Sequence, residues 1–352
     1  MGKRSTVSMM DVAALAGVSR GTISNVLNSP ELVAPATRAR VLEAIEKLGW
    51  VRNESARQLR AGRSTAIGLI VRDISNPFFS DMARGVEEVA AAAGHSVLLS
   101  DSARDPDRER AALDLYQQLR VGGVILAPIS PGDRGLSRRL DIPVVLADRI
   151  GDYDDACAVS VDDFVGGQVA ATHLLEQGHR RLMAVGGTID IPHVRERRDG
   201  ASRAVLLGDA EATLQVLSTD RLDIDGGRSA AAAIGAMPDD ERPTGVFALN
   251  DLAAIGLLQG LIFRRVAVPD DISIVGYDDI EFAAAAAVPL STVRQPSLEL
   301  GRRAAELVLG EMRALEDGEP HRHIQERFTP VLVARSSSSR PAVGQPMLQE
   351  SS

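Results

Sequence analysis

A short segment near the N-terminus gathers side chains that are suited to contacting DNA. Arginine pairs well with guanine in the major groove and asparagine with adenine, while small hydroxyl side chains reach bases or phosphates. The residues that we expect to face DNA are Arg20, Gly21, Thr22, Ser24, Asn25 and Asn28. Their spacing predicts that they share the exposed face of one helix, which suits the major groove.

A tight turn and two further helices are needed to position this face. Val12, Ala13 and Ala16 give a preceding helix its apolar side, Gly17 permits the positive φ of a sharp turn, and Val18 fills the corner. The other apolar positions of the unit are Ile23, Val26, Leu27, Val41, Leu42, Ile45 and Leu48. The segment is therefore predicted to form a helix-turn-helix with a three-helix core. The alternative is an ordinary helical hairpin.

The ends of these helices carry the expected signals. Ser8 followed by Asp11 is a helix-start pattern, and Ser19 is suited to be the N-cap of the second helix. Pro35 suits the first position of the third helix. Ser8 also belongs to the DNA contacts that we expect.

Several motifs of the chain recur together in one known family. The segment that begins at Asp11 reads Asp-Val-Ala-x-x-Ala-Gly-Val-Ser, and Asn-x-x-Ala-Arg-x-Leu begins at Asn53. Ile67 begins Ile-Gly-Leu-Ile-Val, and Asn76 begins Asn-Pro-Phe-Phe. In these motifs and their order, to about residue 335, the chain resembles the lactose/galactose repressor family of bacterial transcription regulators.

The resemblance implies a hinge between DNA-binding domain and core. In the family this segment becomes helical on the operator and places a leucine in the minor groove, at the position of Leu59. An isolated short helix is marginal in water, and an inserted apolar side chain can bend the duplex. Asn53, Ala56 and Leu59 join the expected DNA contacts. The alternative is a plain polar linker, which the neighbouring Arg57 and Arg60 disfavour.

The charges of the chain are divided unevenly. Residues 1–63 contain ten lysines and arginines against five acidic residues, whereas the remainder contains 29 against 43. A basic segment joined to an acidic body is typical of a polyanion-binding module on a globular core. We therefore expect double-stranded DNA to bind at the N-terminal end of the chain.

From residue 66 onwards, short apolar runs alternate with helical patterns. The runs expected as strands are Ala66–Val71, Ser96–Ser100, Gly123–Ala127, Pro143–Ala147, Ala158–Val161, Arg181–Gly186, Thr213–Leu217, Gly245–Leu249 and Ile272–Gly276. Apolar strands with intervening helices indicate parallel sheets covered on both faces, and this pattern is too long for one sheet. The predicted fold is a small all-α helix-turn-helix domain followed by an α/β core of two parallel-sheet subdomains. The resemblance implies that this core is periplasmic-binding-protein-like.

Polar residues follow several of these strands, where ligands of open α/β sheets bind. The resemblance implies that the effector pocket is lined by Phe78, Phe79, Asp148, Arg197, Asn250, Asp278 and Gln295. Such a set of acceptors, donors and flat apolar side chains suits a polyhydroxylated or flat polar small molecule. Taken singly, each carboxylate has the alternative of being a loop residue or a helix cap.

The domain boundaries follow from these assignments. We expect a DNA-binding domain at 1–52, a hinge at 53–63, a core at 64–340 (first subdomain about 64–163 and 292–325, second about 164–291 and 326–340) and a disordered tail at 341–352. The chain should cross between subdomains near 162–165, 289–294 and 325. The serine-rich stretch from Ser336 onwards is expected to be disordered, and the absence of leucine heptads argues against a tetramer-forming coiled coil. The segment from 200 to 226 is short for the family.

Other classes of protein have little support in the sequence. There is no nucleophile elbow and no phosphate loop, the histidines and the single Cys157 lack metal-ligand spacing, and no cofactor or metal is expected. Cys157 reads as a small buried hydrophobe, and His321 and His323 as loop residues. Asp162 and Asp163 read as a crossover with a helix cap rather than a catalytic pair. No segment is apolar enough to span a membrane, so a cytoplasmic protein is expected.

The sequence thus predicts a homodimeric regulator, not an enzyme. It should act as a repressor on a palindromic operator and respond to a small molecule in the core. A sugar is favoured as the effector, because Asp148, Asn250 and Asp278 offer several acceptors for hydroxyls. One alternative is a regulator that depends on a corepressor or partner protein and senses a nucleobase or another metabolite. A more remote alternative is a sugar-binding module without a role on DNA.

Overall fold

The structure is a computed structural model that describes residues 7–50, 65–129, 140, 142–149, 156–187 and 191–339. The chain divides into two compact units, residues 1–64 and 65–352, and each is considered by itself. The expected hinge contacts Asn53, Ala56 and Leu59 lie outside the described residues, as does the tail from 341 to 352.

The first unit is a three-helix bundle. It consists of α1 (Met9–Ala16), α2 (Arg20–Asn28), a short 3₁₀ turn (Pro30–Leu32) and α3 (Pro35–Leu48). The buried core residues are Val12, Ala16, Ile23, Val26, Val41 and Ala44. Leu42 was expected in this core, but it is 46% exposed. The apolar side of α3 follows positions 41, 44, 45 and 48, and Leu42 points about a quarter turn away from them.

Local side-chain bonds set the ends of the first two helices as expected. Ser8 and Asp11 form a capping box on α1, in which the Ser8 backbone N–H donates to Asp11 over 2.8 Å. Gly17 follows in the left-handed region with φ 64°, and the Ser19 hydroxyl accepts from the Thr22 N–H. Helix α3 has Pro35 in its first turn, and its N-cap position makes no side-chain hydrogen bond.

The second unit contains two six-stranded sheets with equivalent strand orders. The first has the order β11-β5-β4-β3-β1-β2 and the second β12-β10-β9-β8-β6-β7. The strands are β1 (Ala66–Val71), β2 (Ser96–Asp101), β3 (Gly123–Leu126), β4 (Val144–Ala147), β5 (Cys157–Val161), β6 (Arg181–Val185), β7 (Thr213–Leu217), β8 (Gly245–Ala248), β9 (Ser273–Asp278), β10 (Ser291–Arg294), β11 (Gln325–Phe328) and β12 (Val331–Val333). All described pairings are parallel except that of β10 with β12.

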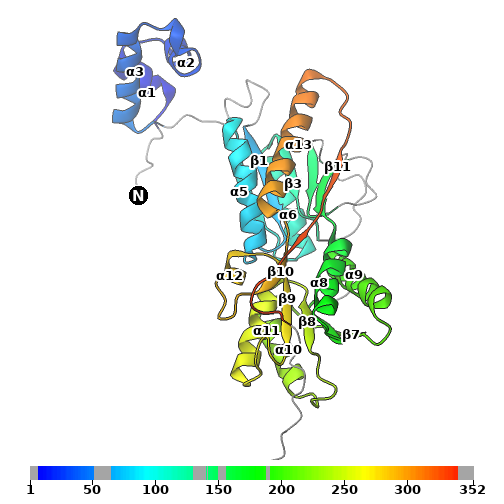
Figure 1. The fold of residues 1–352 in the computed structure, drawn as a ribbon. Coiled ribbons are helices and arrows are strands. Elements are labelled where there is room, and N and C mark those ends of the chain that lie inside the picture. The colour runs from blue at the N-terminus through cyan, green and yellow to red at the C-terminus, as the bar shows by residue number, and fades with distance from the viewer. Residues whose placement is uncertain are drawn as a thin grey trace, which may run out of the picture. The chain divides into compact units, whose positions relative to one another are not determined.

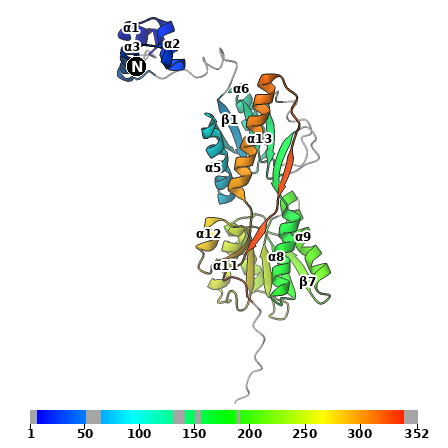
Figure 2. The same ribbon diagram turned by 45° about the horizontal axis from the view of Figure 1, so that its top comes forward.

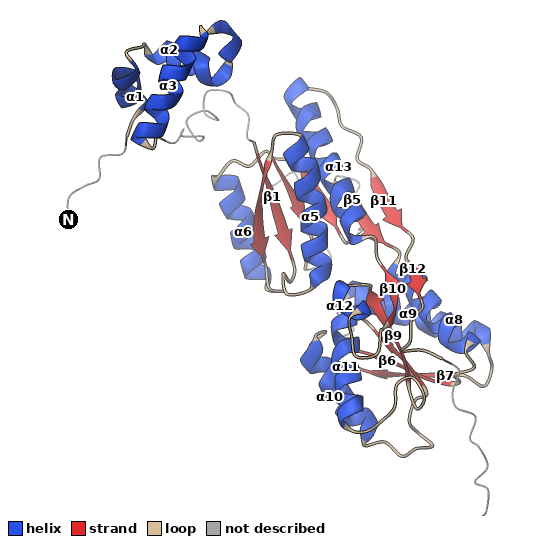
Figure 3. Cartoon of the chain, turned by 60° about the vertical axis from the view of Figure 1, so that its left-hand side comes forward, coloured by secondary structure: helices blue, strands red, loops and turns tan. Residues whose placement is uncertain are grey.

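Helices cover both faces of each sheet, which explains the apolar strands (Figure 1, Figure 3). Around the first sheet lie α5 (Pro77–Ala92), α6 (Pro106–Gln118) and α13 (Ser297–Asp317). Around the second lie α8 (Asp163–Glu176), α9 (Pro192–Gly208), α10 (Ile224–Gly235), α11 (Asp251–Phe263) and the short α12 (Glu281–Ala284). Alternate strand residues face α5 and α13 on one side and α6 on the other, so the first subdomain has two apolar layers.

Helices α8 and α9 pack backbone to backbone through glycines. A Cβ atom at Gly167 would lie 1.8 Å from the carbonyl oxygen of Arg197, and one at Gly200 would lie 1.9 Å from that of Phe164. Only glycine permits such an approach. This contact fixes the first turns of α9 against the start of α8.

The chain passes between the subdomains three times, after β5, after β10 and between β11 and β12 (Figure 2). The first passage lies at Asp162, where we expected it. The other two lie a few residues later than the expected boundaries, because Ser291–Arg294 belongs to the second sheet and Gln325–Phe328 to the first. The segment from 200 to 226 still forms a complete α/β step of α9, β7 and the start of α10.

The beginning of the C-terminal stretch is ordered against the second sheet, contrary to the expectation of disorder from Ser336. The Ser337 hydroxyl donates to the Ile274 carbonyl over 2.6 Å and accepts from the Ser291 N–H over 2.8 Å. His173 contacts the Ser338 hydroxyl, and His179 contacts the Ser339 carbonyl, both at 2.8 Å. Composition alone indicated disorder, but each serine here satisfies a polar group of the second subdomain.

Candidate functional site

A cavity of about 270 Å³ lies between the two subdomains of the core. All seven residues expected in an effector pocket line it: Phe78, Phe79, Asp148, Arg197, Asn250, Asp278 and Gln295. The cavity is also lined by seven residues that were not predicted: Arg72, Asn76, Arg104, Ile129, Ile191, His193 and Leu222. The cavity therefore combines carboxylates, amides and cations with an apolar wall.

Asp278 ends β9 and connects the two subdomains. Its carboxylate accepts from Gln295 Nε2 at 2.6 Å and from Asn76 Nδ2 at 3.3 Å, and it lies 3.7 Å from Arg197 Nη1. Asn76 belongs to the first subdomain, where it caps α5. Burial raises the pKa of Asp278 to about 6, against the lowering effect of Arg197 and the two amides. Its φ of 114° is rare for a residue with a side chain.

Asp148 follows β4 and supplies a second carboxylate. One of its oxygens is paired with Arg72, while the buried Oδ1 has no hydrogen-bond partner among the described residues. Burial raises the pKa of Asp148, and Arg72 partly offsets that effect. The backbone is again in the left-handed region, with φ 57°. A buried acceptor without a donor is costly, so this oxygen is suited to accept from a bound ligand.

Arg197 is almost fully buried and firmly held by α9. Its Nε donates to Asp163 at 2.7 Å, its Nη1 donates to the Leu249 carbonyl at 2.7 Å, and its guanidinium stacks 3.7 Å from the centre of the Tyr277 ring. Burial would lower the pKa of Arg197, but Asp163, Tyr277 and Asp278 together raise it. Arg197 therefore remains a fixed positive charge beside Asp278.

The two amides that we expected in the pocket have different roles. Asn250 is the N-cap of α11: its Oδ1 accepts from the Ala253 N–H at 2.8 Å and its Nδ2 donates to the Leu222 carbonyl at 3.1 Å. Both ends of this amide are therefore engaged. Gln295 uses its Nε2 for Asp278, and its buried Oε1 has no partner among the described residues. Gln295 thus offers a second acceptor that a ligand can use.

The apolar wall comes from the start of α5. The rings of Phe78 and Phe79 meet edge to face with centres 5.1 Å apart, and Arg72 lies 5.4 Å from the centre of the Phe79 ring. His193 lines the cavity from the second subdomain. Burial, together with neighbouring arginines, lowers the pKa of His193 well below its ordinary value. The histidine is therefore neutral near pH 7 and offers both a donor and an acceptor.

The rule that found Asp148 and Asp278 also points to two of the missed residues. Arg72 follows β1, and Arg104 comes three residues after β2, at the same edge of the first sheet. Asn76 stands in the Asn-Pro-Phe-Phe motif, of which the sequence predicts only the phenylalanines in the pocket. Asp163 lies in α8, distant in sequence from Arg197, and no local pattern indicated their ion pair.

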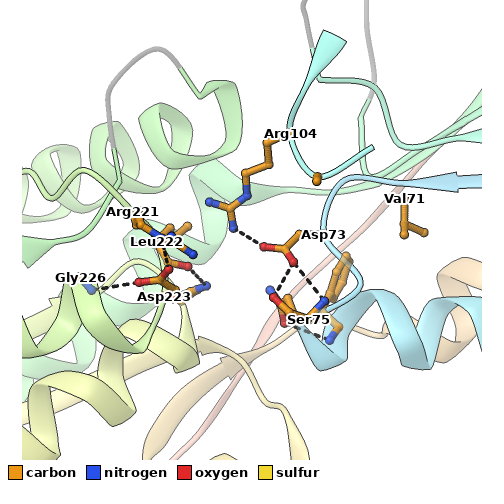
Figure 4. Close-up of polar contacts among 12 residues, drawn as sticks. Val71, Asp73, Ser75, Arg104, Arg221, Leu222, Asp223 and Gly226 are labelled. Atoms are coloured by element: carbon orange, nitrogen blue, oxygen red, sulfur yellow. Dashed lines mark hydrogen bonds and ion pairs between the residues drawn. The ribbon is translucent and has the colours of Figure 1, made fainter. Parts of the chain in front are cut away.

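Charged residues of both subdomains face each other near the cavity (Figure 4). Arg104 of the first subdomain pairs with Asp73 at 2.9 Å, while Arg221 and Asp223 of the second form their own pair. Asp223 also caps α10 through the Gly226 N–H at 2.9 Å. Burial raises the pKa of Asp223, but hydrogen bonds from Gly226 and Arg221 and the nearby charges of Arg221 and Arg104 lower it, and the net effect is a lowered pKa. Arg104 of the first subdomain therefore favours the ionised form of a carboxylate in the second.

In the first unit, α2 presents the predicted DNA-reading face. Arg20, Gly21, Asn25 and Asn28 are exposed, whereas Ile23 and Val26 are buried. Four candidates also take part in local bonds: Thr22 contacts Ser19, Asn28 donates to Ser24, and Ser8 belongs to the capping box of α1. Arg20 and Asn25 thus have the most accessible side chains for base contacts.

Comparison with known proteins agrees with both units. Residues 8–53 match the family described as bacterial regulatory proteins, lacI family, and residues 171–338 match the periplasmic binding protein-like domain. The ribose operon repressor of Escherichia coli is 31% identical over 334 residues, which cover 94% of this chain and 99% of that protein. The chain belongs to the LacI family. It is therefore a DNA-binding transcription regulator with a small-molecule effector.

Two further relatives extend the comparison. The HTH-type transcriptional repressor PurR of Photobacterium profundum is 32% identical over 338 residues, which cover 94% of this chain and 98% of that protein. The crystal structure of a LacI family regulator from Enterococcus faecium with bound ribose is 29% identical, covers 78% of this chain and 99% of its own, and has a TM-score of 0.68. These relatives are transcription regulators. None of the described helices is long and apolar enough to cross a membrane.

Proposed function

We propose that the effector of this regulator is a monosaccharide bound in the cavity between the subdomains. The observation that carries the proposal is the pair of buried acceptors, Asp148 Oδ1 and Gln295 Oε1, which have no donor among the described residues. The hydroxyl groups of a sugar supply such donors, and the apolar face of a sugar ring packs on aromatic side chains such as Phe79. A volume of about 270 Å³ is at the small end for ligand pockets, which favours one sugar ring over two.

A purine is the second candidate, because Phe78 and Phe79 form a flat apolar wall. The named relatives include both ribose operon repressors and PurR, so names alone do not decide between the two classes. The two acceptors favour the sugar, since a purine ring offers few donors.

The expected mechanism couples the cavity to DNA. The protein acts as a homodimer that represses from a palindromic operator, with α2 of each copy in a major groove and Leu59 at the minor groove. The hydrogen bond between Asn76 and Asp278 joins the subdomains, and a ligand beside it changes the free energy of their relative arrangement. Operator affinity and effector affinity are then linked reciprocally. The protein acts by binding alone, without chemical change to its ligand.

A ligand screen on the full-length chain tests the proposal. Thermal unfolding is followed with pentoses, hexoses, adenine and guanine, and hits are confirmed by calorimetry. A ligand at 100 times its Kd adds about 2.7 kcal/mol to the free energy of unfolding. We expect a monosaccharide to stabilise the protein, to change its affinity for a palindromic site selected from random DNA, and to be recovered unchanged. Stabilisation by a purine alone, or consumption of the sugar, would contradict the proposal.

A further inference from the structure

A second group of polar side chains lies at the other end of the first subdomain. Cys157 is the first residue of β5, Glu311 belongs to α13, and His321 and His323 stand in the segment between α13 and β11. Their potential ligand atoms all lie within 4.8 Å of one another. Cys157 begins its strand, whereas the cavity lies at the carboxyl ends of the strands, so this cluster is separate from the effector site.

Four distances within the cluster are close to those of a metal-binding tetrahedron. Cys157 Sγ lies 3.3 Å from His321 Nε2 and 3.9 Å from His323 Nδ1. Glu311 Oε1 lies 3.4 Å from His323 Nδ1 and 3.8 Å from His321 Nε2. Zinc bonds of about 2.0–2.3 Å at tetrahedral angles place neighbouring ligand atoms roughly 3.3–3.6 Å apart. These four separations are therefore within about 0.3 Å of the values around one ion, and the other two are at most 4.8 Å.

The surroundings of Glu311 provide an independent reason for a cation. This carboxylate is 6% exposed, yet its ion pairs among the described residues involve only the two histidines and no arginine or lysine. A buried carboxylate without a permanent positive partner is costly, and a bound cation removes that cost. The Ile324 N–H donates to Cys157 Sγ at 3.2 Å, which is an outer contact typical of a metal-bound thiolate.

We propose that Cys157, Glu311, His321 and His323 bind one divalent transition-metal ion of the Zn²⁺ type. A thiolate with two imidazoles selects a borderline ion such as Zn²⁺ or Co²⁺ over Mg²⁺ and Ca²⁺, which prefer oxygen ligands. Four protein ligands leave no open position, as in structural zinc sites. The side chains of His321 and His323 are 24% and 29% exposed, and they give the ion a route from solvent.

The ion would anchor the segment that connects α13 to β11. Among the described residues, the segment from Gly318 to Ile324 has no regular secondary structure, and it leads into β11, whose sheet partner is β5. Ligands from this segment, from β5 and from α13 would join all three elements. Metal binding therefore stabilises the edge of the first sheet and does not require a ligand in the effector cavity.

Metal analysis of the untagged full-length protein tests the proposal. After exposure to Zn²⁺ and desalting, we expect one zinc per chain. With free Zn²⁺ at 100 times its Kd, we expect the melting temperature to rise by roughly 5 °C or more. With Co²⁺ we expect visible bands of a tetrahedral ion and a near-ultraviolet thiolate-to-cobalt band. That band reports on Cys157 alone, because the chain has one cysteine. Mg²⁺ and Ca²⁺ should give neither effect.

Three variants separate this site from adventitious binding. Cys157→Ser should lose the thiolate band and most of the zinc. The double variant His321→Gln with His323→Gln changes partly exposed loop residues, so it remains informative if Cys157→Ser fails to fold, and it should lose the zinc. His95→Ala removes a histidine elsewhere in the same subdomain, between α5 and β2. This variant should keep both the bound zinc and the thiolate-to-cobalt band. The proposal is overturned if the wild type retains no more zinc than the double variant, or if bound Co²⁺ lacks the thiolate band.

Discussion

Replacing Asp278 by asparagine should separate effector binding from folding and from DNA binding. Asparagine keeps the shape of the side chain and an oxygen that can accept from Gln295, but it removes the negative charge. Hydrogen bonds to charged groups contribute about 1.5–3 kcal/mol. If one effector hydroxyl donates to this carboxylate, Asp278→Asn weakens effector binding roughly 10- to 150-fold.

The same substitution should leave the protein at least as stable at pH 7. Burial raises the pKa of Asp278 to about 6, so its ionised form makes folding less favourable at pH 7 than a neutral side chain would. Arg197 keeps its ion pair with Asp163 at 2.7 Å, so no buried cation loses its last partner. The melting temperature should therefore be unchanged or higher, and operator affinity without effector should remain near that of the wild type.

Asp279→Asn is the matched control. The two oxygens of Asp279 accept from Arg294 and Arg335, each at 2.6 Å, and Asp279 does not line the cavity. This variant should lose stability but keep its effector affinity once folded. Calorimetry for the effector, thermal unfolding, and fluorescence anisotropy with labelled operator make the three measurements. An unchanged effector affinity in Asp278→Asn, or a lowered melting temperature with lost operator binding, would refute the assigned role of Asp278.

Three further outcomes are expected. Arg20→Ala and Asn25→Ala should each cost about 1–3 kcal/mol on the true operator and relax base preference, as anisotropy titrations with altered sites would show; retained affinity and preference in both would exclude α2 as the reader. Leu59→Ala should preserve effector affinity but reduce operator affinity and bending, and equal bending in a circular-permutation assay would contradict this role. Below pH 6 effector affinity should fall, by up to about tenfold per pH unit, because the effector binds ionised Asp278; binding near pH 6 should release protons, measurable by calorimetry in different buffers. A flat profile between pH 5 and 7 would count against that coupling.

The first nine strands of the core were predictable because each is a short, mainly apolar run between helical patterns. The strands Ser291–Arg294, Gln325–Phe328 and Val331–Val333 were not predicted. They are short, two of them carry polar or charged residues, and they lie toward one edge of each sheet, where β11 pairs with β5 and β12 pairs with β10, both distant in sequence. Such pairing is a tertiary effect that periodicity does not record.

The candidate site was predictable to the extent that strand order determines it. Parallel strands place Asp148 at the carboxyl edge of the first sheet and Asp278 at that of the second, and the resemblance supplied the aromatic wall. The sequence did not reveal that both ends of the Asn250 amide form hydrogen bonds within the protein, because capping depends on local geometry. It also did not indicate that Cys157 lies beside His321 and His323, because these residues come together through the pairing of β5 with β11.

The three passages between the subdomains have a mechanical consequence. Gln295 lines the cavity and lies in the second passage, immediately before α13 begins at Ser297. A ligand that contacts Gln295 therefore acts at a joint between the subdomains, and helix α13 begins beside that joint. The helix has 21 residues and a length of about 30 Å. Each degree of rotation at the joint moves its far end by about half an ångström, so a small adjustment around a bound ligand is magnified at the opposite edge of the subdomain, where the chain enters β1.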